Sequence, residues 1–258
     1  TPDTARLTHG KLCKRIRDKL SEDDRTKGFI YVLQDPGRKE SVWKIGYTKR
    51  VYNERIDEHS NCCNFEPFIA HVSAQAIQNC KLLEKLIHRD LCHKVRYRSC
   101  PNKIKGHTEW FEVSEEVAVQ TVKKWERFIH EEKPYDSQGN LNVVWSYVLE
   151  KRSPAALGVL DMSHDARQEQ WADILAPPTY NDYIYAYLAY ARSEVKATYD
   201  WVYMFFWQLS TILYSLHTLA LCRNRPAFYA LVFVLTCAVL PNFRLQSTKK
   251  QKVSSPNK

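Results

Sequence analysis

Cysteine is sparse in this sequence and is not arranged for metal or disulfide chemistry. Eight cysteines in 258 residues are too few for a dense disulfide framework. One region brings cysteine and histidine close together, but it lacks the C-x-x-C pair that makes a zinc site recognisable. Its six members are Cys80, His88, Cys92, His93, Cys100 and His107. We therefore expect reduced thiols and no zinc site.

Acidic residues are outnumbered by basic ones. The chain has 38 lysines and arginines against 29 aspartates and glutamates, with a net charge of +9 and an isoelectric point near 9.1. This balance favours an anionic partner, either nucleic acid or an acidic membrane surface. On charge alone, a basic surface that serves only solubility is an equal alternative. Hydrophobic residues make up 44% of the chain, enough for a real core, and its length leaves room for two units.

Two short segments rich in β-branched and aromatic residues, Gly28–Leu33 and Val42–Tyr47, predict a β-hairpin. The residues between them, 34–40, include an Asp-Pro-Gly sequence, which is typical of a turn. The hairpin places Tyr31 and Gly46 on neighbouring strands. Further strands are expected at residues 65–72 and 110–113, and helices at 51–60, 74–91 and 115–131. This order predicts an α+β domain.

Ionisable residues recur at helical spacing behind the hairpin. Arg55 and His59 are four residues apart, as are Glu84 and His88, so each pair shares one face of a helix. Together with Tyr31, these side chains can converge on the hairpin. The structural alternative treats Tyr31 as a packing residue, Arg55 and Glu84 as an ion pair, and the histidines as surface residues.

The motifs in this order resemble the GIY-YIG nuclease superfamily. They are Ile30-Tyr31, Lys44-Ile45-Gly46, Arg55 with His59, and Glu84 followed by Ile87. Residues 107–113, with the sequence HTEWFEV, resemble the branch named after phage T-five open reading frame 172, which also occurs in fungal proteins. The sequence departs from the family pattern at Phe29, in the place of the first glycine, and at Lys44, in the place of the second tyrosine.

The resemblance implies a small three- to four-stranded antiparallel sheet flanked by helices, and it implies phosphodiester chemistry. Carried over by position, Glu84 binds a divalent ion such as Mg²⁺ and Arg55 clamps the phosphate. Tyr31 then orients or deprotonates the attacking water, and His59 acts as an auxiliary base or phosphate donor. Lys44 takes the place of the second tyrosine.

Basic residues dominate the segment from residue 85 to residue 105, where Asp90 is the one acidic residue. Such a segment is a candidate phosphate-tracking surface, because lysine and arginine contacts supply most nonspecific affinity for nucleic acid. A basic loop with no ligand is the alternative. The candidate nucleic-acid-binding residues are Lys85, Arg89, Lys94, Arg96, Arg98, Lys103 and Lys105.

The remaining segments surround a GIY-YIG-like domain at residues 28–132. Residues 1–27 predict a basic amphipathic helix, because Leu12, Ile16 and Leu20 recur every four residues. Residues 133–180 are rich in proline, glycine and serine, which predicts a linker with one or two short helices.

The C-terminal part is far more apolar than the rest. Residues 201–221 and 227–243 contain no charged side chain, and about 20 apolar residues are needed to span a bilayer. Residues 181–243 therefore predict an aromatic-rich helix followed by a hydrophobic helical hairpin in a membrane, with residues 244–258 as a basic disordered tail. The alternative is a buried pair of helices in a soluble domain.

Several functions stay open on the sequence. The first is a membrane-anchored, divalent-metal-dependent endonuclease, and the second is a noncatalytic DNA-binding module on the same fold. The third is a membrane adaptor whose folded domain binds protein. The expected partners are nucleic acid, DNA in the first instance, and a lipid bilayer. We expect an endomembrane or the nuclear envelope, with the folded domain on the cytoplasmic or nucleoplasmic side.

Overall fold

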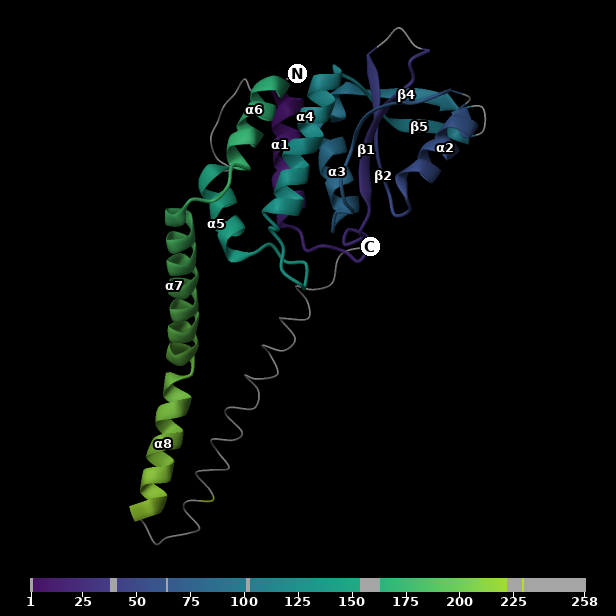
Figure 1. Ribbon diagram of the computed structural model, residues 1–258. Coiled ribbons are helices and arrows are strands. Elements are labelled where there is room, and N and C mark those ends of the chain that lie inside the picture. Colours follow the sequence, from purple (N-terminus) through teal and green to yellow (C-terminus); the bar gives the residue numbers. More distant parts are fainter. Residues whose placement is uncertain are drawn as a thin grey trace. The chain divides into compact units, whose positions relative to one another are not determined.

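The computed structural model describes residues 2–37, 41–63, 65–100, 103–153, 163–221 and 229. The chain divides into two compact units, Thr1–Leu188 and Ala189–Lys258. The first unit contains a β-sheet with helices on both faces (Figure 1). The second contains the rest of a long helix and the helix that follows it.

The described residues form a single five-stranded sheet in which every neighbouring pair of strands is antiparallel. The strand order is β3-β1-β2-β5-β4. The strands are β1 (Phe29–Gln34), β2 (Val42–Thr48), β3 (Phe68–Val72), β4 (Val95–Cys100) and β5 (Lys103–Glu112). The α+β class and the antiparallel sheet are therefore confirmed. The predicted number of three to four strands was too low, because the basic segment folds as β4 and pairs with β5.

The predicted hairpin is present, with Tyr31 opposite Gly46. The helices around it are α1 (Pro2–Arg17), α2 (Tyr52–Cys63), α3 (Cys80–Asp90), α4 (Glu115–Glu126), α5 (Val143–Arg152) and α6 (His164–Ile174). Helix α4 starts where its sequence supplies a cap, since the Ser114 hydroxyl accepts a hydrogen bond from the Val117 amide. Helix α3 begins later than the sequence predicts. Asn79, just before it, has a left-handed backbone, and Ile77 forms a bridge with Gly28 instead of a helical turn.

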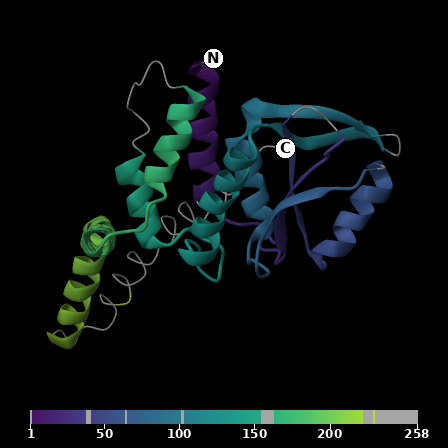
Figure 2. The ribbon, with the colours of Figure 1, turned by 45° about the horizontal axis from the view of Figure 1, so that its top comes forward.

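The two faces of the sheet are covered differently (Figures 1 and 2). Helices α1, α3 and α4 cover one face, which we call the core face. The alternating residues Ile30 and Val32 point into it and are fully buried with the apolar stripes of these helices. Helix α2 covers the other face, which we call the α2 face. A small cluster around Tyr31 and Ile56 packs there. Alternation along each strand thus sends every second side chain into a large core or into a small one.

Residues outside the predicted domain contribute to the core face. Leu12 and Ile16 of α1 are fully buried, as the amphipathic pattern predicts. The segment predicted as a linker with short helices contains α5 and α6, and these helices bury Trp145 and Trp171 in the same core. The segment is therefore part of the folded unit rather than a spacer.

The predicted transmembrane hairpin is not supported. Residues 201–221 are divided between α7 (Tyr180–Met204) and α8 (Phe206–Leu221), which is 16 residues long. A helix needs about 20 apolar residues to cross a bilayer. Within the residues that the structure describes, no helix has the length and apolar character that a membrane span requires. The second predicted segment, residues 227–243, and the tail lie outside the described residues apart from Tyr229.

Candidate functional site

One cross-strand row defines the polar centre of the α2 face. Strand pairing places Lys44 opposite Leu33 on one side and opposite Trp110 on the other, and Trp110 lies opposite Arg96. Residues directly opposite in an antiparallel pair share one face of the sheet. Leu33 and Trp110 belong to the apolar cluster of the α2 face. The row therefore carries two cationic side chains on the side where Tyr31 lies.

Tyr31 lies across Gly46. A Cβ atom added to Gly46 would come within 2.6 Å of the Tyr31 Oη atom and 2.8 Å of Cζ. Real contacts of this kind are never so short, so this position accepts no side chain while the ring keeps its place. The Ile-Gly pair of the sequence motif thus has a physical cause in the structure. Glycine makes room for the tyrosine ring of the neighbouring strand.

The Tyr31 hydroxyl is surrounded by charged groups from three other elements. The Arg55 guanidinium of α2 donates a hydrogen bond to it, and the carboxylates of Glu109 and Glu84 lie near enough to act on it. Burial raises the pKa of Tyr31 well above its usual value; Glu109 and Glu84 add to this rise, and Arg55 opposes it. Tyr31 therefore keeps its proton at neutral pH, which suits a hydrogen-bond donor better than a base.

Arg55 is held in place by a carboxylate on its own helix. Its Nη1 atom lies 2.6 Å from Oε2 of Glu58, and Arg50 pairs with the other oxygen of the same glutamate. Burial lowers the pKa of Arg55, but the hydrogen bond with Glu58 and the nearby Tyr31 outweigh this and raise it. Arg55 is thus a permanently charged donor that is aimed at Tyr31.

Glu84 reaches the edge of the same site from α3. One of its oxygens accepts a hydrogen bond from the Tyr47 amide at 3.2 Å, and the other lies 3.4 Å from Nζ of Lys81. Glu84 is a buried residue. The sequence suggests that Tyr31, Arg55 and Glu84 can converge. In the structure Arg55 contacts Tyr31, and the charge of Glu84 acts on Tyr31 from α3. The structure also shows that Glu84 already has a cationic partner.

Lys44 forms an ion pair that the sequence analysis missed. Its ammonium is buried, with only 1% of the side chain exposed, and it contacts the Glu109 carboxylate, which is 39% exposed. Strict alternation along β5 would place Glu109 on the face opposite Trp110. However, residue 97 of β4 stands opposite two residues of β5, because Arg96 pairs with Trp110 while Arg98 pairs with His107. This bulge turns Glu109 to the α2 face.

The structure describes the side chain of His88 but not that of His59, the two histidines of the helical pairs. His59 lies on α2, but its side chain is outside the described residues. His88 lies on α3, where its Nε2 atom is 2.8 Å from the Ile45 carbonyl oxygen and its ring packs against Phe111. Phe111 belongs to the large core. His88 therefore ties α3 to β2 and does not face Tyr31.

The seven basic candidates do not form one surface. Lys85 pairs with Asp24 at 2.8 Å, and Arg89 donates to the Lys11 carbonyl at 3.4 Å, so both lie on the core side of the sheet. Arg96 lies on the α2 face and pairs with Glu112. Lys94 is exposed, in the 3₁₀ turn Cys92–Lys94. The side chains of Arg98, Lys103 and Lys105 in the β4–β5 hairpin are outside the described residues.

The described residues offer a resident magnesium ion one candidate carboxylate, that of Glu84. Mg²⁺ prefers oxygen ligands and keeps several waters, so one open carboxylate would suffice. In the structure Tyr47 and Lys81 each engage one of the two oxygens of Glu84. A search of the described residues finds no group of three or more histidine, cysteine, aspartate or glutamate side chains that could hold a metal. We therefore assign no reaction step to an ion at Glu84.

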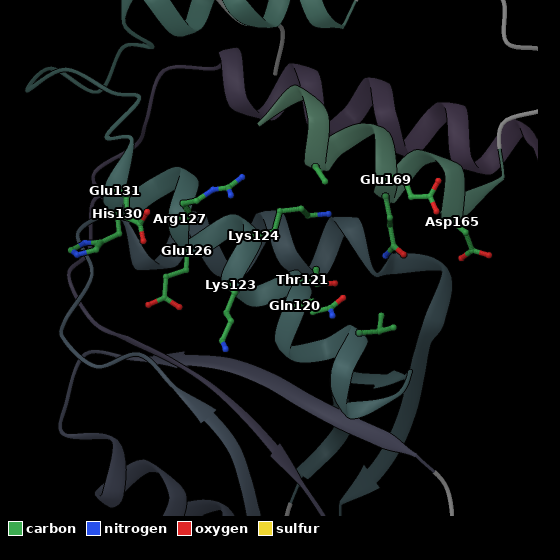
Figure 3. Close-up of a pocket in the computed structure, with 13 residues that line it drawn as sticks. Gln120, Thr121, Lys123, Lys124, Glu126, Arg127, His130, Glu131, Asp165 and Glu169 are labelled. Carbon is green, nitrogen blue, oxygen red and sulfur yellow. The ribbon is translucent and has the colours of Figure 1, made fainter. Parts of the chain in front are cut away.

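A separate hollow lies between α4 and α6, away from this site (Figure 3). Its volume is about 730 Å³. Lys123 lines it from α4, Arg127 from the π-helical turn Arg127–Glu131 that follows, and Asp165 and Glu169 from α6, so its walls carry charges of both signs. No single ligand class is favoured by such a lining. The hollow lies on the core side of the sheet and shares no residue with the Tyr31 site.

Comparison with known protein families finds a match to part of the chain. Residues 28–126 match the family described as T5orf172 domain. This is a GIY-YIG-related, DNA-binding domain family, so the match indicates nucleic-acid-binding or nuclease-like function for these residues. No match was found among curated proteins or among solved structures. The matched residues run from β1 to the end of α4 and contain every group placed around Tyr31.

Proposed function

We propose that this protein binds nucleic acid through the α2 face of its sheet. The observation that carries the proposal is the convergence of Arg55, Lys44 and the protonated Tyr31 hydroxyl on one side of the β1–β2 hairpin. All three are donors, and the phosphate backbone offers acceptors. The family match over residues 28–126 supports the same class of partner.

The arrangement suits the phosphate backbone better than the bases. Arginine binds phosphate oxygens in a bidentate manner, while lysine acts as a point charge. Arg96 extends the cationic row of Lys44 to β4, at the edge of the sheet. A polymer that lies along this row would contact the centre and the edge of the sheet together. We therefore expect binding that depends on backbone charge and little on base sequence.

The test is a fluorescence-anisotropy titration of a labelled DNA duplex with the 258-residue chain. Affinity should fall steeply between about 50 and 200 mM salt, because binding releases counterions from the phosphates. Arg55→Ala should weaken binding by about tenfold or more, since a charged donor at the centre is lost. Binding that ignores both salt and Arg55→Ala would overturn the proposal.

Hydrolysis of the bound phosphodiester is the second candidate function. The observation that favours it is the position of Glu84 beside Tyr31 and Arg55, in the order that the resemblance to GIY-YIG nucleases implies. In this interpretation Arg55 neutralises charge on the phosphoryl oxygens. The raised pKa of Tyr31 lets it hold a water molecule through its proton rather than remove a proton from it.

Plasmid nicking separates the two candidates. Supercoiled plasmid is incubated with the chain, with and without magnesium, and the nicked form is measured on a gel. If the protein cleaves, Glu84→Gln should abolish nicking and leave DNA affinity within about twofold. The amide keeps the size of the side chain but loses the negative charge at the position where the resemblance implies a metal ligand. Nicking that survives Glu84→Gln would exclude this assignment. Binding without nicking would leave the noncatalytic function.

A further inference from the structure

Each cationic side chain of known position on the α2 face has a glutamate as its partner. Lys44 contacts Glu109, Arg55 contacts Glu58 and Arg96 contacts Glu112. The three pairs differ in burial. The Lys44 side chain is 1% exposed and that of Arg96 is 60% exposed. Phosphate oxygens are acceptors for the same cations, so a phosphate would compete with these glutamates.

We propose that Glu109 is an exchangeable counter-ion of Lys44, and that a backbone phosphodiester displaces it when nucleic acid binds. The inference rests on the proposed function and adds how the site is regulated. A carboxylate and a phosphodiester carry the same single charge, and both present oxygen acceptors to an ammonium. A phosphate therefore replaces Glu109 at Lys44 without leaving the buried ammonium unpaired.

The fold determines which partner moves. Lys44 lies in the middle of a strand, between Leu33 and Trp110, and its Nζ atom is 6.0 Å from the centre of the Trp110 ring. It has no room to leave this place. Glu109 stands at the bulge in β5, with a carboxylate that is partly exposed. A bulge disrupts the strand ladder locally, so Glu109 can turn outward with little loss of strand pairing.

Electrostatics makes the exchange obligatory. Glu109 and an incoming phosphate would both have to lie within contact distance of one ammonium, and two like charges at about 4 Å repel one another strongly near a protein surface. Glu84 and Glu109 also both act on Tyr31, so the site is already rich in carboxylate charge. Binding therefore requires that Glu109 leave. Glu109 lowers the affinity of the site and makes it selective for ligands with high charge density.

The exchange predicts an unusual salt dependence. Each phosphate neutralised by a protein cation releases about 0.9 counterions from duplex DNA. When Glu109 is expelled into solvent, Lys44 no longer neutralises its negative charge. The charge then attracts salt cations, which offsets part of that release. Removing the carboxylate should therefore tighten binding and also steepen the salt dependence by a fraction of one ion.

The experiment is a double-mutant cycle in the full chain. Glu109→Gln should tighten binding of a labelled DNA duplex by about tenfold, because the buried Lys44 then lacks an anionic partner until phosphate arrives. In the Lys44→Met background the same substitution should change affinity by less than about twofold. Glu112→Gln, at an exposed pair, should have a small effect of about twofold. Glu116→Gln is the charge-matched control on α4, where the residue is exposed and outside the site.

Each outcome decides the inference. An unchanged or weaker affinity in Glu109→Gln, or equal gains in both Lys44 backgrounds, overturns it while the proposed function stands. If no variant binds DNA, the proposed function fails and takes the inference with it. Thermal unfolding shows whether Glu109→Gln folds. If Glu109→Gln does not fold, Glu109→Asp replaces it. The shorter carboxylate binds Lys44 more weakly, so DNA affinity should rise by less than in Glu109→Gln. An affinity that does not rise would overturn the inference.

Discussion

The same alternating strands form both faces of the sheet, but the two faces pair their buried charged groups in different ways. On the core face, a charged group is buried only where partners neutralise it completely. Asp90 is fully buried and receives hydrogen bonds from Arg167, Lys124 and Trp125. On the α2 face, buried Lys44 has a partner that reaches solvent. The first arrangement holds helices together, whereas the second leaves an exchangeable contact. This difference is one reason why we propose the α2 face as the functional one.

The largest expected effect is on the core face. Arg167 of α6 bonds to both the side chain and the backbone carbonyl of Asp90 on α3, and it is fully buried. Arg167→Met removes two charged hydrogen bonds to Asp90 and leaves Lys124 as its cationic partner, so the free energy of unfolding should fall by about 3–5 kcal/mol. Urea denaturation followed by circular dichroism measures it. Arg192→Met, at an exposed site on α7, is the matched control. A loss below about 1 kcal/mol would show that the two faces do not differ as argued.

Features that depend on neighbouring residues could be predicted from the sequence, and features that join distant residues could not. The hairpin that places Tyr31 opposite Gly46 and the helix that carries Glu84 and His88 follow local periodicity, and the structure confirms them. The Asp90–Arg167 pair joins residues far apart in the sequence. Arg167 lies in the segment whose composition predicts a linker. Composition alone does not show such a pairing.

The Glu109 contact was hidden for another reason. Glu109 is part of the motif at residues 107–113, but strict alternation of side chains along β5 assigns it to the wrong face of the sheet. Only a register shift between β4 and β5 brings it to Lys44. Likewise, the basic run looked like one surface because residues near in sequence were assumed to be near in space. A helix and a strand divide it between the two faces.

The next effect concerns the contact between β1 and β2. Gly46→Ala places a methyl group against the Tyr31 ring, so the ring must move, at a cost of about 1–3 kcal/mol in unfolding free energy. DNA affinity should fall as well, since Tyr31 leaves Arg55. Gly10→Ala in α1 is the control, because nothing lies within 4 Å of its Cβ position and alanine favours a helix by about 1 kcal/mol. Equal behaviour of the two variants would contradict the packing of Tyr31 over Gly46.

A smaller effect is expected on acidification. The rings of His93 and His164 stack with centroids 3.9 Å apart, and burial together with the neighbouring His164 and Arg167 lowers the pKa of His93 to about 4. The unfolded chain takes up this proton near pH 6.5, while the folded chain resists it. The free energy of unfolding should therefore decline as pH falls from about 6.5 to about 4, by about 1 kcal/mol after solvent screening.

Urea midpoints at a series of pH values measure this decline. His93→Gln removes one titrating group and should reduce the slope within that window; some slope remains, because burial also lowers the pKa of His9 and of His164. The lowered pKa of Asp90 adds a further loss, but only at lower pH, since its stabilisation is complete above the pKa of an unfolded aspartate. An unchanged slope in His93→Gln would rule out the histidine stack as the cause.

The smallest effect on stability is expected at Arg96, and this position compares the two faces most directly. Arg96 is exposed on the α2 face and pairs with Glu112, and such surface pairs contribute about 0–1 kcal/mol. Arg96→Glu should leave the unfolding free energy almost unchanged but weaken DNA binding, and the salt dependence should lose about one ion because a phosphate contact is gone. Arg89→Glu makes the same charge change at an exposed position of α3, on the core side. If DNA lies on the α2 face, salt titrations by fluorescence anisotropy will show a loss for Arg96→Glu well beyond that for Arg89→Glu. Equal losses would mean that net charge, and not the face of the sheet, governs binding.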